Sequence, residues 1–278
     1  MGTKSEYGTR EIEAAKSILV ELMQILGEYR EQMVLIGGWV PYFLFGSNHI
    51  GSTDIDIAID KDQISDHVYH SMRENLEHHG YREGRQMFQF IKSVKIDAGE
   101  AIEVAIDFLA GEYGGTGKSH RHQKVQDLRP RKARGCELAL KYNTRITVDG
   151  VMPDGVCNTV VVQLSDVVPF IVMKGMALYD RMKEKDAWDI YFCVREFADD
   201  RDALVAEFQQ VLDHGLVIEG LAKIRSKFRA VDQMGPEFVV AFEKLTDRDE
   251  REQLQRDAYE RVNELMDRLG IVAFEELA

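Results

Sequence analysis

The chain has 278 residues, of which 45% are hydrophobic and 30% charged, so it can form one large or two modest domains with an ample core. Its 48 acidic and 35 basic residues give a net charge of −13, which argues against a protein that coats nucleic acid over its whole surface. The sequence has no apolar signal segment and no apolar run near the roughly 18 residues that a membrane helix needs. We therefore expect a cytoplasmic protein with no membrane span.

An amphipathic helix is expected over residues 10–28, where apolar side chains recur at helical spacing. The following stretch, residues 34–60, reads VLIGGWVPYFLFGSNHIGSTDIDIAID. A short apolar strand ends there in Gly37 and Gly38, and a helix is expected over residues 39–45. Glycines at a strand-to-helix switch let backbone N–H groups approach a phosphate closely. The stretch therefore predicts a phosphate-binding turn.

The run DIDIAID over residues 54–60 alternates acidic or small residues with isoleucine, which predicts a strand. The isoleucines face a core, while Asp54 and Asp56 share the other face about 6–7 Å apart. Two carboxylates at this separation can both reach a pair of bound Mg²⁺ ions in a phosphoryl-transfer site. The alternative is an ordinary half-exposed strand whose acidic residues face water.

Together, the glycine pair, the helix and the run STDIDI over residues 52–57 resemble the signature of the polymerase-β-like nucleotidyltransferase superfamily. The form is most similar to the AbiEii-type branch, which contains toxin nucleotidyltransferases of bacterial abortive-infection and toxin–antitoxin systems. The resemblance implies transfer of a nucleoside monophosphate from an NTP to an acceptor hydroxyl, with release of pyrophosphate. It assigns phosphate binding to Gly37, Gly38 and Ser52, and Mg²⁺ binding to Asp54 and Asp56.

Residues 64–79 predict a helix, and residues 87–94 and 101–110 predict two strands. In the second strand, Asp107 falls on the polar face. The resemblance implies that Asp107 is the third carboxylate of the site, as a metal ligand or as the acceptor of the hydroxyl proton. Glu103 could share or replace it, and the alternative is a surface acid on an edge strand.

A long segment without a helix or strand pattern, residues 112–135, is rich in lysine and arginine between residues 118 and 134. Its GKS run is not a Walker A loop, because Glu112 stands where that motif needs its first glycine. In an acidic protein, these basic side chains are the best candidates to contact an RNA phosphate backbone. The alternative is a solvated loop that neutralises nearby acids.

Further strands are expected over residues 136–147 and 156–164, and helices from residue 165 onward. We therefore expect an α+β protein. A nucleotidyltransferase-like lobe with a mixed sheet is predicted over residues 1–164. A helical C-terminal lobe that closes the nucleotide cleft is predicted over residues 165–278.

Lys174, followed by the run KDAWDI over residues 185–190, resembles the C-terminal motif of AbiEii-type proteins. This match implies that Lys174 contacts the triphosphate, with Arg181 as a further nucleotide contact. Asp186 or Asp189 would position Lys174 or a base. The alternative is an exposed pair between Lys185 and Asp189, four residues apart on one helix.

From the family likeness and the basic segment, we expect tRNA or another RNA as the acceptor and a cognate antitoxin as a candidate partner. If the protein is an enzyme, the alternative is a small-molecule nucleotidyltransferase of the aminoglycoside type. If it is not an enzyme, the alternative is a non-catalytic nucleotide-binding protein held by an antitoxin. The intact pair of Asp54 and Asp56 argues against the non-catalytic alternative, since binding a partner needs no metal ligands.

Overall fold

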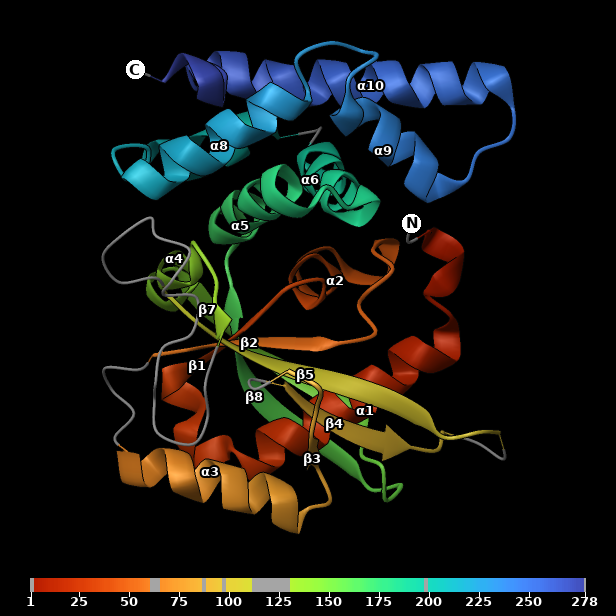
Figure 1. The fold of residues 1–278 in the computed structure, drawn as a ribbon, viewed down its shortest axis with the longest axis vertical. Helices are drawn as coiled ribbons and strands as arrows, with labels where there is room; N and C mark the ends of the chain where they lie inside the picture. The colour runs from red at the N-terminus through yellow and green to blue at the C-terminus, as the bar shows by residue number, and fades with distance from the viewer. Residues whose placement is uncertain are drawn as a thin grey trace. The chain divides into compact units, whose positions relative to one another are not determined.

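The computed structural model describes residues 3–60, 66–86, 89–96, 99–111, 131–197 and 200–277. They belong to two compact units (Figure 1). The sheet unit comprises Tyr7–Val40 and Gly51–Asp166, and the helical unit comprises Met1–Glu6, Pro41–Ile50 and Val167–Ala278. The segment between the glycine pair and the acidic strand is therefore divided between the two units.

The sheet unit is built on one mixed sheet, whose strands run in the order β3-β4-β5-β2-β1-β8-β7, with β6 paired to β5. The pairs β2–β5, β1–β8 and β5–β6 are parallel, and the other neighbours are antiparallel. The α+β prediction with a mixed sheet is therefore confirmed. The strands are β1 (Met33–Ile36), β2 (Ile55–Ile59), β3 (Arg82–Glu83), β4 (Gln89–Val94), β5 (Ile102–Ala110), β6 (Arg131–Lys132), β7 (Asn143–Val151) and β8 (Cys157–Ser165).

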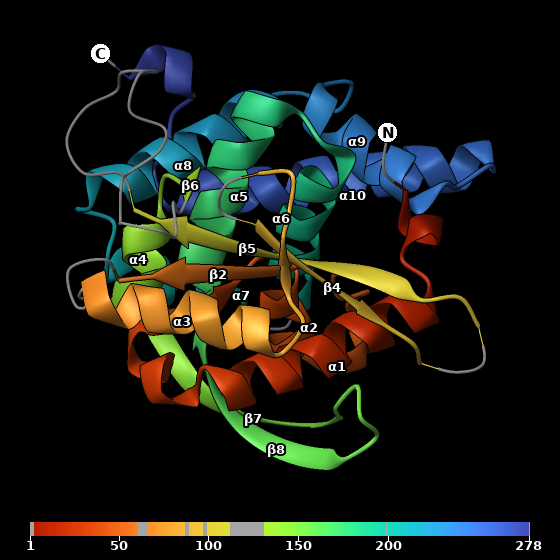
Figure 2. The same ribbon diagram turned by 60° about the horizontal axis from the view of Figure 1, so that its bottom comes forward.

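Helix α1 (Thr9–Ile25) packs on β4, β5, β7 and β8, which Figure 2 shows with α3 (Asp66–His78) in front. The buried residues of α1 recur at the spacing that predicted the helix, and Ala15, Ile18 and Leu22 are fully covered. Residues 33–36 and 55–59 form strands as expected, and the isoleucines of β2 are fully buried. The alternation in the sequence thus fixed which side of β2 faces the core.

The strand predicted over residues 136–147 is wrong in its first half. Helix α4 (Cys136–Lys141) forms there, and β7 begins at Asn143. Gly135 lies in the left-handed region with a φ of 98°, so an extended chain cannot run through it. The residues that follow are mostly good helix formers, and α4 packs against β1, β2 and β5.

The C-terminal part of the helical unit contains α5 (Val167–Arg181), α6 (Glu184–Glu196), α7 (Arg201–Gln209), α8 (Gly215–Lys227), α9 (Met234–Glu243) and α10 (Arg248–Arg268). The chain reverses between α5 and α6 at Met182, which has a φ of 51°. Helices α5 and α6 then pack against each other, α5 also packs on α8, and α6 packs on α9. Helix α2 (Trp39–Phe45) begins in the sheet unit and ends in the helical unit.

A membrane-spanning helix is not found in the part of the chain that the structure describes, because none of its helices combines sufficient length with sufficient apolar character.

Candidate functional site

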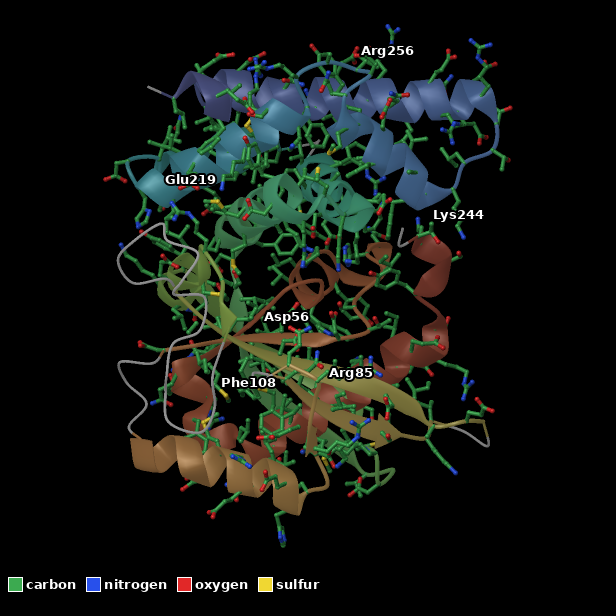
Figure 3. The ribbon with its side chains drawn as sticks, viewed as in Figure 1. Asp56, Arg85, Phe108, Glu219, Lys244 and Arg256 are labelled. Atoms are coloured by element: carbon green, nitrogen blue, oxygen red, sulfur yellow. The ribbon has the colours of Figure 1, made fainter. Side chains whose placement is uncertain are left out.

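In the sheet unit, the predicted acidic residues of two strands lie side by side. Strand β2 pairs in parallel with β5, and Asp56 is the register partner of Asp107. Register partners on neighbouring strands share a face, and their backbones are about 4.8 Å apart. Both residues are half-buried, and Figure 3 shows Asp56 and Phe108 on opposite sides of the sheet. The structure thus brings Asp56 and Asp107 together on one face, away from the core residue Phe108.

The glycine turn lies against the carboxylate of Asp56. Gly37 follows β1, whose last residue Ile36 is the antiparallel partner of Asp56. A Cβ atom placed on Gly37 would lie 2.2 Å from Oδ2 of Asp56, and the φ of Gly37 is 72°. A side chain at position 37 would therefore strain the backbone and would displace the Asp56 carboxylate. The predicted phosphate-binding turn and the predicted acidic strand meet at this point.

Asp54 lies just before β2 and is held by two contacts. Its backbone carbonyl accepts a hydrogen bond from the indole Nε1–H of Trp39 at 2.8 Å, and its carboxylate accepts a short hydrogen bond from the Ser52 hydroxyl. Trp39 is completely buried, so its donor has a partner inside the protein, as a buried indole requires. Sequence reasoning did not select Trp39, although the residue stands directly after the glycine pair.

The carboxylates of Asp56 and Asp107 suit a hard divalent cation. Within the described ranges, no three or more His, Cys, Asp or Glu side chains are arranged to hold a metal ion. A Mg²⁺ ion, however, is usually bound through one or two carboxylates together with water and substrate phosphates. Oδ1 of Asp107 accepts a hydrogen bond from Gln89 at 3.0 Å, which orients that carboxylate. The pair therefore fits the chemistry of Mg²⁺, and Asp54 is a further oxygen donor two residues from Asp56.

Glu103, the alternative to Asp107, pairs with Arg82 at the surface. Its side chain is 58% exposed, and it lies four residues from Asp107 along β5. Asp107 rather than Glu103 is thus the register partner of Asp56. The basic stretch expected to bind RNA lies outside the described residues from position 112 to 130, and its last residues form β6 and the turn before α4.

In the helical unit, the residues of the second motif form a buried cluster of charges. The ammonium group of Lys174 lies 2.6 Å from Oδ2 of Asp189 and 3.0 Å from Oδ1 of Asp186. Arg181 donates to both oxygens of Asp186 at 2.8 Å, and Lys185 donates to both oxygens of Asp189 at 3.0 and 3.1 Å. Three cations, from two helices, thus surround the two carboxylates.

Burial makes this cluster different from a surface ion pair. Asp186 is 1% exposed and Asp189 is fully buried, so the alternative of an exposed pair between Lys185 and Asp189 is wrong. Burial alone would raise the pKa of Asp189, but Lys174 and Lys185 hold that pKa well below its usual range. Burial alone would lower the pKa of Lys174, but Asp189 and Asp186 raise it. Asp189 and Lys174 therefore keep their charges near neutral pH.

His49 is a member of the cluster that sequence reasoning missed. Its Nε2 lies 3.0 Å from Oδ1 of Asp189, and both side chains are fully buried. Its ring packs against the rings of Trp188 and Phe192 at 5.1 and 4.9 Å between centroids. The only signal in the sequence was its place five residues before Asp54, within the motif stretch.

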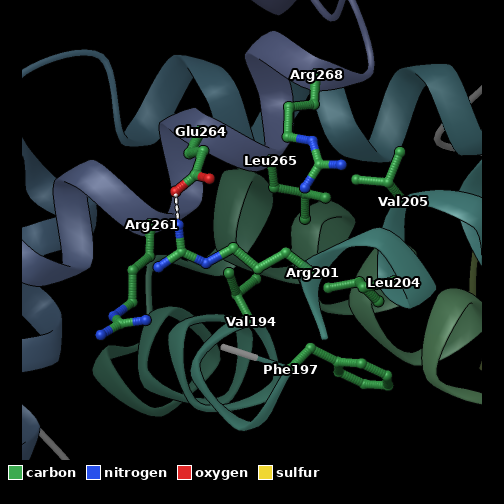
Figure 4. A pocket seen from close by; sticks show the side chains of 9 residues that line it. All are labelled: Val194, Phe197, Arg201, Leu204, Val205, Arg261, Glu264, Leu265 and Arg268. Atoms are coloured by element: carbon green, nitrogen blue, oxygen red, sulfur yellow. Dashed lines mark hydrogen bonds and ion pairs between the residues drawn. The ribbon is translucent and has the colours of Figure 1, made fainter. Parts of the chain in front are cut away.

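An apolar pocket in the helical unit lies elsewhere and contains none of the predicted site residues. Figure 4 shows it between α6, α7 and α10, with Leu204 and Leu265 among its lining residues. Arginines also line it, and Arg201 is paired with Glu264. This pocket therefore does not explain the predicted chemistry, because none of the predicted carboxylates and lysines lines it.

Comparisons with known proteins do not place the chain in a family. No protein-family model matches it, and no curated protein matches it significantly. The Helicobacter pylori protein JHP933 has 11% sequence identity and a TM-score of 0.43, with 92% of this chain and 94% of that chain covered. An H. pylori candidate nucleotidyltransferase has 12% identity and a TM-score of 0.41, with 92% and 96% covered. At these levels, the likeness carries no argument about activity.

Proposed function

We propose that this protein is a Mg²⁺-dependent nucleotidyltransferase that moves a nucleoside monophosphate from an NTP to an acceptor hydroxyl. One observation carries the proposal: Asp56 lies between the backbone of Gly37 and the register partner Asp107. A glycine turn in which a side chain would be strained, next to two carboxylates on one face, would provide phosphate contacts and metal ligands at one place. An ordinary half-exposed acidic strand would need neither feature.

Each residue of the sheet unit has a defined role in this proposal. Asp56 and Asp107, with Asp54, would hold Mg²⁺, which when bound neutralises charge on the transferred phosphoryl group. The backbone N–H groups of Gly37 and Gly38 and the hydroxyl of Ser52 would contact phosphate oxygens. The acceptor oxygen forms a bond to the α-phosphorus, the bond from that phosphorus to the bridging oxygen breaks, and pyrophosphate leaves. The acceptor proton would pass to the Asp107 carboxylate.

The charged cluster of the helical unit would bind the triphosphate. Lys174 carries a compact positive charge, which suits phosphate oxygens. Its side chain is 11% exposed, so a small part of it remains accessible. Asp186 and Asp189 would position Lys174, and Arg181 would add a second cation.

The acceptor that we propose is tRNA or another RNA, bound through the basic residues between 118 and 134. The support for this acceptor is the sequence alone: a basic segment in a chain of net charge −13, and the AbiEii-type motifs. The same motifs support a toxin role and a cognate antitoxin as partner. RNA binding would weaken steeply with salt, because several counterions are released from the phosphate backbone.

A label-transfer assay tests the proposal. Purified protein and Mg²⁺ are incubated with each α-³²P-labelled NTP and with total tRNA, a protein extract or an aminoglycoside panel. We expect label in RNA with the wild type and no transfer with Asp56→Asn. The matched control is Asp60→Asn, which makes the same chemical change just after β2 and should keep activity. Transfer by Asp56→Asn at the wild-type rate would refute the assignment of the site.

The other outcomes distinguish the alternative functions. Label in an aminoglycoside would assign a small-molecule nucleotidyltransferase, and label in a protein would assign protein modification. If wild-type protein binds Mg²⁺ and NTP but transfers no label to any acceptor, the transferase proposal fails. The non-catalytic nucleotide-binding alternative would then stand, and capture of a partner would be the next experiment.

A further inference from the structure

His49 lies between the two predicted motifs in the chain, after the short helical turn Gly46–Asn48 and before the stretch that leads to Asp54. Its ring is fully buried against two aromatic residues of α6. Its ring nitrogen Nε2 also reaches a carboxylate of the same helix. A histidine held from both its ring face and its ring edge has a fixed orientation.

The proton of His49 can be assigned from its partner. Burial lowers the pKa of His49 to about 4, with the contact to Asp189 acting in the opposite direction, so the imidazole is neutral at pH 7. A neutral imidazole has one N–H group, and the ionised carboxylate of Asp189 can only accept a hydrogen bond. The proton therefore lies on Nε2 and is donated to Oδ1 of Asp189, 3.0 Å away.

This hydrogen bond determines how the Asp189 carboxylate is turned. Oδ1 accepts from His49, and Oδ2 lies 2.6 Å from the ammonium group of Lys174. Lys185 bridges both oxygens at 3.0 and 3.1 Å, so it cannot by itself fix which oxygen faces Lys174. The N–H of His49 distinguishes the two oxygens, because the ring is held in place and donates a hydrogen bond to Oδ1 only.

We propose that His49 is a positioning residue, which holds the Asp189 carboxylate in the rotation that places the ammonium group of Lys174 for the triphosphate. The inference rests on the proposed function. A histidine that only fills the core would matter for stability, and its replacement would leave nucleotide affinity unchanged in folded protein. A positioning histidine must affect nucleotide affinity through its N–H group.

Two substitutions separate these roles. His49→Phe keeps an aromatic ring against Trp188 and Phe192 but removes the donor. His49→Gln keeps an N–H donor at a similar distance from the backbone and loses the ring. We expect His49→Phe to weaken NTP binding about tenfold, a typical size for the coupling between a positioning contact and a binding site, because the Asp189 carboxylate can then turn away from the rotation that places Lys174. We expect His49→Gln to stay within about threefold of the wild type.

Binding is measured by calorimetry with Mg²⁺ and the α,β-methylene analogue of each of the four NTPs, so that the readout does not need turnover. If an NTP supports transfer, the KM for that NTP should rise with His49→Phe and recover with His49→Gln. Wild-type affinity in folded His49→Phe would overturn the inference, and so would equal loss in both variants. If the wild type binds no analogue, Lys174 is not a triphosphate contact and the inference fails as well.

The proposed function can fail separately. Wild-type protein that binds an analogue but transfers no label would refute the transferase activity, while the comparison of the two variants would still decide the role of His49. If neither variant folds, the ¹⁵N spectrum of the wild-type histidines at pH 7 tests the hydrogen bond on which the inference rests. A neutral His49 protonated on Nε2 is expected, and a proton on Nδ1 would overturn the inference, because that tautomer cannot donate to Asp189.

Discussion

Replacing Asp189 with asparagine should destabilise the helical unit by about 3–5 kcal/mol, the usual cost of removing one partner from a buried ion pair. Asp189 is fully buried and lies within 3.1 Å of the ammonium groups of both Lys174 and Lys185. Asparagine has nearly the same shape, so the change creates no cavity. It removes the negative charge that compensates two desolvated lysines and leaves Asp186 as the remaining carboxylate of the cluster.

Urea unfolding at pH 7 measures this loss, with tryptophan fluorescence as the probe, to which Trp188 in the same helix contributes. The matched control is Glu77→Gln, which removes the charge of a 45% exposed carboxylate paired with Arg73 four residues earlier. That pair is exposed to water, so we expect a change within about 0.5 kcal/mol. A loss below about 1 kcal/mol for Asp189→Asn would contradict the conclusion that the cluster is desolvated.

Two further predictions concern packing and pH. Gly220→Ala should lower the free energy of unfolding by about 1–3 kcal/mol, because its new Cβ would lie 2.9 Å from the backbone oxygen of Val172 where α8 packs on α5. The control is Gly215→Ala on the same helix, where the new Cβ has open space and no such loss is expected. Equal urea midpoints for the two variants would refute the close packing of α8 on α5. The pKa of His49 falls from 6.5 to about 4 on folding. The free energy of unfolding is therefore not reduced by this group above pH 6.5, and it decreases by about 3 kcal/mol as the pH falls to 4, because the unfolded chain then binds the proton more tightly. Unfolding midpoints measured from pH 7.5 to 4 should show this loss in the wild type and less of it in His49→Gln, and the same pH dependence in both would contradict the assignment.

The sequence was sufficient for features that depend on local periodicity. The alternation around Asp56 predicted that this residue faces away from the isoleucines, and the same rule placed Asp107 opposite Phe108. The pairing of Asp56 with Asp107 could not be predicted, because register depends on which strands become neighbours. These residues are 51 positions apart in the chain, and only the folded sheet places them side by side on neighbouring strands.

The charged cluster shows a second limit of sequence reasoning. Lys174 and Asp186 are twelve residues apart, and a continuous helix would separate them by about 18 Å. The reversal at Met182 brings their side chains to 3.0 Å. Lys185 and Asp189 are four residues apart, and this spacing is the same whether such an ion pair is exposed or buried. Burial of Asp189 could therefore not be recognised before the packing of α5 and α6 was known.

The cluster is difficult to explain by stability alone. Desolvating ions is costly, and hydrophobic residues of similar volume often stabilise a protein as well as or better than a buried ion pair. In this cluster, the ammonium group of Lys174 and both of its carboxylate partners are almost completely buried. The triphosphate that we propose as ligand would bring further negative charge to Lys174 and would offset part of the desolvation cost only when bound. Nucleotide should therefore stabilise the wild-type protein by mass action, and this stabilisation should disappear when Lys174 is replaced by methionine.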